Sequence, residues 1–337
     1  MLLLCIICSP FCPLFKLAIT FSIQPVKIEN SLIKIDCKKT FGINCNFEVS
    51  GFKTPSDLVP NLDKNYLFDE KTSKAILAGF AYNQRVLIQG MHGTGKSTHI
   101  EQIASRLNWP CMRINFDSQI TRLDLVGKDT IKLKNDKQIT EFKEGIIPFA
   151  LRNGVALVLD EYDAIKTDVS FVIQRLLEED GKFALLEENE IITPHPNFRL
   201  FATSNTLGAG DDLGIYHGTN LINQAQMDRW NIVASLNYLS EEYEITILQK
   251  KLTFLSSKEH QQTAKLMVKI ANLSREAFKN GDISNLISLR TLISWGRNIE
   301  IFNSVKDAFI LSFYNKIIDD EKSVIREFYQ RVFGEEI

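Results

Sequence analysis

The sequence predicts an α/β fold with a central parallel sheet, two inserted β-hairpins and a small all-helical lid at the C-terminal end. Three observations favour this fold. From Phe41 to about residue 240, short apolar runs alternate with amphipathic segments, as in a parallel sheet covered by helices. Two stretches in this region alternate apolar and polar residues around a turn. Beyond it, apolar residues recur at helical spacing of three and four.

Five segments are expected to form the strands of the sheet: 86–89, 112–116, 155–160, 199–204 and 231–237. Four of them are near-continuous apolar runs, as strands buried on both faces are. The helix that follows the first strand places Ile100, Ile103 and Leu107 on one face and polar residues on the other.

The two hairpins are expected at residues 130–142, which turn at Asn135-Asp136, and at residues 181–195. The acidic tip of the second hairpin, EENE, is interpreted as solvated surface. Helices of the lid are expected at 241–255, 261–281 and 305–318.

The segment GMHGTGKS, residues 90–97, matches the P-loop pattern of glycine, four residues and Gly-Lys-Ser between a strand and a helix. Glycines permit close approach of backbone N–H groups to phosphate oxygens, and the N-terminus of the helix favours negative charge. We expect Lys96 to reach the β- and γ-phosphates and Ser97 to hold Mg²⁺. The residues expected to bind nucleotide are Gly90, His92, Gly93, Thr94, Gly95, Lys96, Ser97 and Thr98. The alternative is a glycine turn without a ligand.

Three polar residues follow two later strands of the predicted sheet. Asp160 and Glu161 end an apolar run, so both carboxylates are expected at the edge where the P-loop lies. Asp160 is suited to bind Mg²⁺ and Glu161 to act as general base, although Glu161 as a simple helix cap remains the alternative. Asn205 ends the next apolar run and is expected to contact both the γ-phosphate and the attacking water. The pattern therefore predicts hydrolysis of a nucleoside triphosphate.

These features together resemble AAA+ ATPases of the branch that includes MoxR proteins, chelatase motors and replicative helicases. The chain most closely resembles the CobS family, the ATPase subunits of aerobic cobaltochelatase. The resemblance is carried by FGINCNFEV, ILAGFAYNQRVLIQGMHGTGKSTHIEQIASRLNWPCMRIN, RLDLVGKD, VLDEYDA, FVIQRLLEEDGK, HPNFRLFATSNT, GIYHGTN and QMDRWNIVASLNYL. It runs from about Phe41 to the C-terminus and implies an N-terminal segment at 37–75, an AAA+ core at 76–240 and a helical lid at 241–337.

The resemblance implies a cytoplasmic, ATP- and Mg²⁺-dependent motor that forms a homo-oligomeric ring, expected to be a hexamer. Its implied partners are CobT-like and CobN-like subunits, and its implied reaction is Co²⁺ insertion into hydrogenobyrinic acid a,c-diamide. Arg229 matches an arginine finger that acts on a neighbouring subunit's nucleotide, and Arg290 matches a lid arginine that contacts the nucleotide of its own subunit. A surface salt bridge is the alternative for each. The other functional hypotheses are a MoxR-like chaperone for another metalloenzyme, a scaffold that binds nucleotide without turnover, and a DNA helicase.

Composition bears on the partners of the protein. The chain has 337 residues, 45% of them hydrophobic and 24% charged, and a net charge of −2. This balance supplies no bulk basic field for phosphates, so we expect no nucleic-acid partner and disfavour the helicase. A metal site formed by His92 or His99 is not expected either, because no convergent Cys or carboxylate accompanies them in the sequence. His195 and His217 lie in inserts, where they could contact a partner or a cobalt ion in transit, but metal binding by them is not expected.

Residues 1–36 are an atypical apolar extension that we leave out of the predicted fold. No basic residue precedes its apolar run, and prolines and a lysine interrupt it. Three interpretations stay open: a dispensable extension, a targeting or anchoring segment, and a metal site on Cys5, Cys8 and Cys12. A membrane partner for the folded part is not expected. Five of the six cysteines lie in the first 45 residues, and we interpret all six as free thiols.

Overall fold

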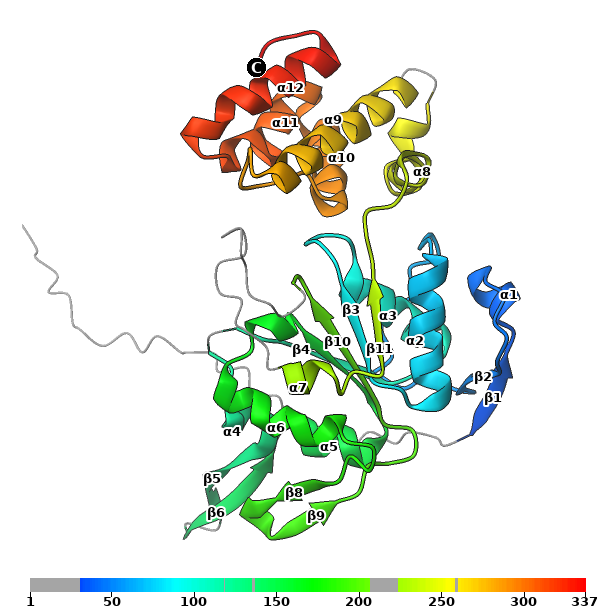
Figure 1. The fold of residues 1–337 in the computed structure, drawn as a ribbon, viewed down its shortest axis with the longest axis vertical. Coiled ribbons are helices and arrows are strands. Elements are labelled where there is room, and N and C mark those ends of the chain that lie inside the picture. The colour runs from blue at the N-terminus through cyan, green and yellow to red at the C-terminus, as the bar shows by residue number, and fades with distance from the viewer. Residues whose placement is uncertain (1–30, 118, 135–136, 207–223, 258–259) are drawn as a thin grey trace, which may run out of the picture.

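The computed structural model describes residues 31–117, 119–134, 137–206, 224–257 and 260–337 (Figure 1). Cys5, Cys8, Cys12 and His217 therefore lie outside the described residues. The three cysteines within them, Cys37, Cys45 and Cys111, are free thiols as expected.

The centre of the molecule is a five-stranded parallel sheet with the order β11-β3-β10-β7-β4. Its strands are β3 (Val86–Gln89), β4 (Cys111–Asn115), β7 (Ala156–Asp160), β10 (Arg199–Ser204) and β11 (Ile232–Ser235). All five predicted strands are confirmed; β3 and β10 have the predicted ends, and the ends of the other three differ by at most two residues. The three inner strands are almost wholly buried, whereas β4 and β11 are partly exposed because they form the edges.

Alternate side chains of the inner strands enter two separate cores, as the period of a strand requires. Ile88, Val158 and Phe201 pack with α2 (Glu70–Tyr82) and α3 (Lys96–Arg106). Leu87, Leu159 and their neighbours pack on the other face with α5 (Ile146–Asn153) and α6 (Thr167–Leu177). The sheet is thus covered on both sides, which is why its inner strands read as continuous apolar runs.

Both hairpins form where the alternation predicts them. One consists of β5 (Gly127–Lys134) and β6 (Lys137–Glu144), and it is longer than the predicted 130–142. The other consists of β8 (Phe183–Leu185) and β9 (Glu190–Ile192), joined by a 3₁₀ turn at Leu186–Glu188. Figure 1 shows both hairpins at the end of the core that lies away from the lid.

The lid has its own aromatic core, separate from the two cores of the sheet. Its helices are α8 (Glu241–Lys251), α9 (Gln261–Asn280), α10 (Leu289–Phe302), α11 (Val305–Ser312) and α12 (Lys322–Phe333). Trp295 of α10 and Tyr329 of α12 both pack on Phe309 of α11. Helices α10 and α12 were not among the expected segments, and the expected 305–318 helix ends at Ser312, followed by a 3₁₀ turn.

The short remaining elements connect the larger ones. They are α1 (Cys37–Phe41), α4 (Arg122–Val126), α7 (Gln224–Met227) and the 3₁₀ turns Tyr162–Ala164, Thr253–Ser256, Tyr314–Lys316 and Asp319–Glu321.

The N-terminal part differs from the predicted division of the chain. Strand β1 (Leu32–Ile35) pairs antiparallel with β2 (Val49–Phe52), so the end of the excluded 1–36 extension belongs to the folded structure. Helix α2 begins at Glu70, so a core boundary at residue 76 falls inside a helix. The exposed side chains of β1 made it indistinguishable from a tail in the sequence.

Strand β2 lies directly against the end of α3. The Phe52 N–H donates to the Leu107 carbonyl over 2.8 Å, and a Cβ on Gly51 would lie 2.6 Å from the same oxygen. The glycine at position 51 is therefore needed for this close approach.

Replacing Gly51 with alanine is expected to lower the free energy of unfolding by about 1–3 kcal/mol, because the added methyl group must push β2 away from α3. Urea unfolding followed by circular dichroism measures this change. Ser50→Ala, on the adjacent residue whose side chain points to the opposite face, is the control. Equal stability of the two variants would contradict the packing described here.

Candidate nucleotide-binding site

The P-loop lies at the carboxyl edge of the sheet, between β3 and α3. Gly93 and Gly95 have φ angles of 72° and 90°, a conformation that side chains disfavour. A Cβ on Gly93 would collide with Ser288 of the lid. Thr94 stabilises the loop from within, since its hydroxyl donates to the Met91 carbonyl over 2.8 Å. The side chains of Lys96, Asp160 and Asn205 converge at this loop. Their presence disfavours the alternative of a glycine turn without a ligand.

Lys96 lies at the centre of this convergence. Its Nζ donates to the carbonyls of Gly90 (2.7 Å) and Met91 (3.0 Å) and to Asn205 Oδ1 (2.8 Å). Burial lowers the pKa of Lys96 to about 8, although the nearby carboxylates of Asp160, Asp163 and Glu161 oppose this shift. The ammonium group is therefore held in place before any phosphate arrives.

Asp160 makes the contacts expected of a residue beside a divalent cation. Its Oδ1 accepts hydrogen bonds from the hydroxyls of Ser97 and Thr203, and Arg113 Nε lies 3.6 Å from its Oδ2. A serine hydroxyl next to a carboxylate provides the hard oxygen ligands that Mg²⁺ prefers, so the residues present fit this ion. Thr203 and Arg113 were not found from the sequence, because their contacts depend on the pairing of strands.

Glu161 directly follows β7 and has a left-handed backbone with φ of 56°. Its N–H donates to Thr203 Oγ1 over 3.2 Å, and the residue is only partly exposed to solvent. The side chain makes no capping hydrogen bond to the turn that follows, so the helix-cap interpretation is wrong. Burial raises the pKa of Glu161, as do the charges of Asp160 and Asp163, whereas Lys96 and Arg113 lower it. A raised pKa suits a general base.

The loop that carries Asn205 is held by Asp163, a second residue that sequence reasoning missed. Asp163 is fully buried, and its Oδ2 accepts hydrogen bonds from the N–H groups of Asn205 (3.0 Å) and Thr206 (2.9 Å) and from the Thr206 hydroxyl (3.0 Å). The structure brings Asn205 to Lys96 as a direct partner. The amide therefore lies beside the group expected to contact phosphate.

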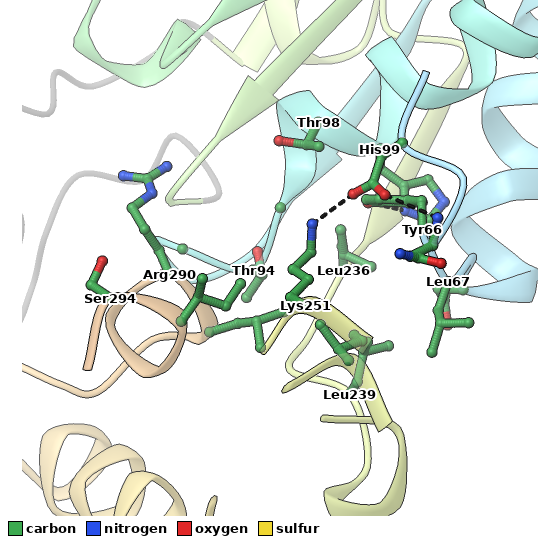
Figure 2. A pocket seen from close by; sticks show the side chains of 18 of the residues that line it. Tyr66, Leu67, Thr94, Thr98, His99, Leu236, Leu239, Lys251, Arg290 and Ser294 are labelled. Atoms are coloured by element: carbon green, nitrogen blue, oxygen red, sulfur yellow. Dashed lines mark hydrogen bonds and ion pairs between the residues drawn. The ribbon is translucent and has the colours of Figure 1, made fainter. Parts of the chain in front are cut away.

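A cavity extends from the P-loop into the space between core and lid. Apolar side chains of Leu67, Leu236, Leu239, Ile247, Leu289 and Ile293 line it, together with Thr98, which is exposed to it. Figure 2 shows Arg290 and Lys251 entering from the lid side and Tyr66 from the segment before α2. Lys251 Nζ forms a 2.7 Å ion pair with Asp63, which connects the lid to the N-terminal segment. An apolar cavity beside a P-loop is a candidate place for the base of a nucleotide.

The histidines near the loop have packing roles. The His92 ring lies 5.7 Å from that of Phe278 in the lid. His99 is buried, with Nε2 2.7 Å from Ser73 Oγ and Nδ1 3.1 Å from the Tyr66 hydroxyl, and burial lowers its pKa to about 4. In the insert, His195 Nδ1 accepts from the Asn197 N–H over 3.1 Å. Across the described residues, no group of three His, Cys, Asp or Glu side chains is arranged to hold a metal ion.

Arg229 is not part of this site in the single chain. It precedes β11, whose first residue pairs with Val86 at the start of β3. The P-loop follows the other end of β3, about 10 Å away along the strand. Arg229 pairs instead with Glu178 of its own chain at 2.8 Å.

The sequence is similar to that of known proteins with nucleotide-binding domains. Residues 85–215 match the model of the AAA domain (dynein-related subfamily), and residues 245–331 match that of the CbbQ/NirQ/NorQ C-terminal domain. Over 303 residues, the chain is 52% identical to the aerobic cobaltochelatase subunit CobS of Sinorhizobium sp., covering 90% of this chain and 91% of the relative. The chain belongs to the CobS family.

More distant relatives share only parts of this CobS-family chain. Midasin of Dictyostelium discoideum is 29% identical over 60% of the chain and 3% of the relative. Protein CbbQ of Hydrogenophilus thermoluteolus is 28% identical over 38% of the chain and 46% of the relative. Among solved structures, the RuvB branch migration motor of Thermotoga maritima aligns with a TM-score of 0.45 at 16% identity, covering 78% of this chain and 75% of that chain.

The predicted resemblance to the CobS family and the predicted AAA fold are both confirmed. No helix among the described residues is long and apolar enough to cross a membrane.

Above pH 8, Lys96 is expected to take up a proton when the protein binds nucleotide. Lys96 of the free chain loses its proton near pH 8, whereas a bound phosphate favours the charged ammonium. Nucleotide affinity should therefore fall as pH rises from 7 to 9, by up to about tenfold per pH unit above the pKa.

Titration calorimetry at pH 8.5 in two buffers of different ionisation enthalpy measures this uptake. The binding heat of the wild type should differ between the two buffers. Lys74→Ala, which removes an exposed lysine on α2, is the control and should show the same difference between buffers. Identical heats in both buffers would contradict the lowered pKa.

Proposed function

We propose that this chain is the ATP-hydrolysing motor subunit of an aerobic cobaltochelatase, acting in the cytoplasm to drive Co²⁺ insertion into hydrogenobyrinic acid a,c-diamide. The observation that carries the proposal is the 52% identity to a cobaltochelatase subunit over 90% of the chain. It favours this function over that of a MoxR-like chaperone. The convergence of Lys96, Asp160 and Glu161 supports turnover over a scaffold that only binds nucleotide.

Each residue of the site has a proposed task. The P-loop N–H groups and Lys96 bind the β- and γ-phosphates of ATP, and Lys96 is already oriented by two carbonyls. Ser97 and Asp160 hold Mg²⁺, which neutralises charge on the phosphates when bound. Glu161 takes the proton of the attacking water, and Asn205 reaches the γ-phosphate from its place beside Lys96.

Two arginines are proposed to act on the triphosphate from different subunits. Arg290 stands at the start of α10 and lines the cavity, which supports a contact with the nucleotide of its own chain. Arg229 lies by the opposite edge of the sheet, and we therefore propose that it acts on a neighbour's nucleotide within a hexameric ring. Such a ring would work with CobT-like and CobN-like subunits, with the chelation step on the CobN-like subunit.

Reconstitution with CobN and CobT tests this function. The wild type is expected to support ATP-dependent cobalt insertion into hydrogenobyrinic acid a,c-diamide. Glu161→Gln should lower both ATP turnover and insertion by about 10²–10⁴-fold, because it removes the general base. Glu188→Gln, at the exposed tip of the second hairpin, should leave both rates unchanged.

Two results would contradict the proposal. A wild type that hydrolyses ATP but supports no insertion with authentic partners would favour the MoxR-like chaperone. Full ATP turnover by Glu161→Gln would contradict the role given to Glu161.

A further inference from the structure

The guanidinium of Arg229 is held by two partners of its own chain. Its Nε donates to Glu178 Oε1 over 2.8 Å, and its Nη1 donates to the carbonyl of Ala225. These bonds use two of the five N–H donors of an arginine. Among the described residues Nη2 has no hydrogen-bond partner, so part of the guanidinium stays available to an anion from outside the chain.

Both residues of this pair are anchored to the start of β3 through Arg85, which is only 7% exposed. Arg85 Nη2 donates to the Glu178 carbonyl over 3.0 Å. The Arg85 N–H donates over 2.9 Å to Oδ1 of Asn231, two residues after Arg229. The Ile232 N–H donates back to the Arg85 carbonyl over 3.1 Å. Glu178 is therefore bound by the side chain of Arg85, and the residues after Arg229 are bound by the backbone of the same buried residue.

Helix α7, which precedes Arg229, is also bound to α6, the helix that ends just before Glu178. The buried Gln226 side chain donates to Ser170 Oγ of α6 over 3.2 Å. Trp230, next to Arg229, is buried in the core beside Tyr162. The segment that carries the arginine is thus held by α6 through Gln226 and by the core through Trp230 before the Glu178 contact is added.

The pair itself contributes little to folding. The side chains of Arg229 and Glu178 are 29% and 37% exposed, and ion pairs open to solvent contribute about 0–1 kcal/mol to stability. A contact that stabilises so little, yet lies on rigid backbone at both ends, mainly fixes the direction of the arginine side chain. Long arginine side chains otherwise sample many rotamers.

We infer that Glu178 is a positioning residue that orients Arg229 toward the nucleotide of the neighbouring subunit. This inference rests on the proposed role of Arg229 in trans. Glu178 contacts neither nucleotide; it lowers the conformational freedom that Arg229 must lose when it meets the γ-phosphate, so its effect falls on the catalysed step. Arg85 holds the Glu178 backbone for this purpose.

The first test is the ATPase rate of assembled rings. Glu178→Ala is expected to lower kcat about tenfold with an unchanged KM for ATP, since its own nucleotide site is intact. Glu178→Gln should stay within about twofold of the wild type, because the amide oxygen accepts the same hydrogen bond. Combining Glu178→Ala with Arg229→Ala should be no slower than Arg229→Ala alone.

A matched control breaks a neighbouring ion pair that does not involve Arg229. Asp180 pairs with Arg175 at 3.2 Å, and both side chains are about half exposed. Asp180→Ala is expected to leave kcat unchanged. Size-exclusion chromatography with light scattering confirms that all variants still form rings, which separates positioning from assembly.

Mixed rings provide a second readout that a merely structural role would not change. Glu178→Ala subunits keep an intact nucleotide site, and Glu161→Gln subunits keep an intact arginine. Mixing the two is expected to raise turnover several-fold above the average of the separate variants, because some Glu178→Ala sites then receive an oriented arginine. Arg229→Ala mixed with Glu161→Gln is the reference for this complementation.

The outcomes separate this inference from the proposed function. If Arg229→Ala lowers kcat but Glu178→Ala leaves it unchanged or raises it, the positioning role of Glu178 is wrong while the motor function stands. The positioning role is also wrong if mixing with Glu161→Gln raises the turnover of Arg229→Ala but not that of Glu178→Ala. If Arg229→Ala itself has no effect, the proposed role in trans is wrong, and the inference falls with it.

Discussion

The alignment of β10 between β3 and β7 is the constraint on which the nucleotide site depends. Ser204 pairs with Gln89 on one side, and Ala202 pairs with Leu159 on the other. Because neighbouring strands lie about 4.8 Å apart, the residues that follow these three strands must meet at one edge. Lys96, Asp160 and Asn205 are more than 40 residues apart in the chain, yet they lie at the same edge for this reason. Lys96 donates to Asn205, and Asp160 accepts from Ser97, the neighbour of Lys96, and from Thr203.

The same parallel sheet gives the opposite edge a different role. Two buried arginines, Arg85 and Arg199, organise that edge by donating to backbone carbonyls. The Arg199 guanidinium also lies 4.9 Å from the ring centre of Trp109. Arg229 belongs to this edge, so one sheet has the P-loop at its carboxyl end and this arginine at its amino end. In the proposed ring, the arginine edge of one subunit would face the nucleotide site of the next.

The sequence could predict the features that are local in the chain. The P-loop, the paired carboxylates and the inner strands each have a pattern within about ten residues, and the structure places them as expected. Asp163, Thr203 and Arg113 were missed because their roles arise only when strands pair and loops meet. Strand β1 was missed since its exposed residues resemble a tail, and its partner β2 lies 14 residues further along the chain.

The residues that line the cavity could not be predicted from the sequence either. Tyr66, Leu67 and Lys251 carry no motif. Tyr66 reaches the cavity because the N-terminal segment lies against His99 of α3, and Lys251 reaches it where the lid meets Asp63 of that segment. Resemblance to a known family supplied Arg229 and Arg290, which spacing alone did not indicate. The partner of Arg229 in its own chain, Glu178, was visible only in the structure.

The most direct test of the central claim, that the site becomes complete only between two subunits, is a structure of the Glu161→Gln ring with ATP and Mg²⁺. The account predicts that Ser97 and Asp160 lie at the metal ion, that Asn205 and Lys96 contact the γ-phosphate, and that Arg229 of the adjacent subunit approaches the same phosphate. A ring in which every Arg229 remains remote from all bound nucleotides would contradict it.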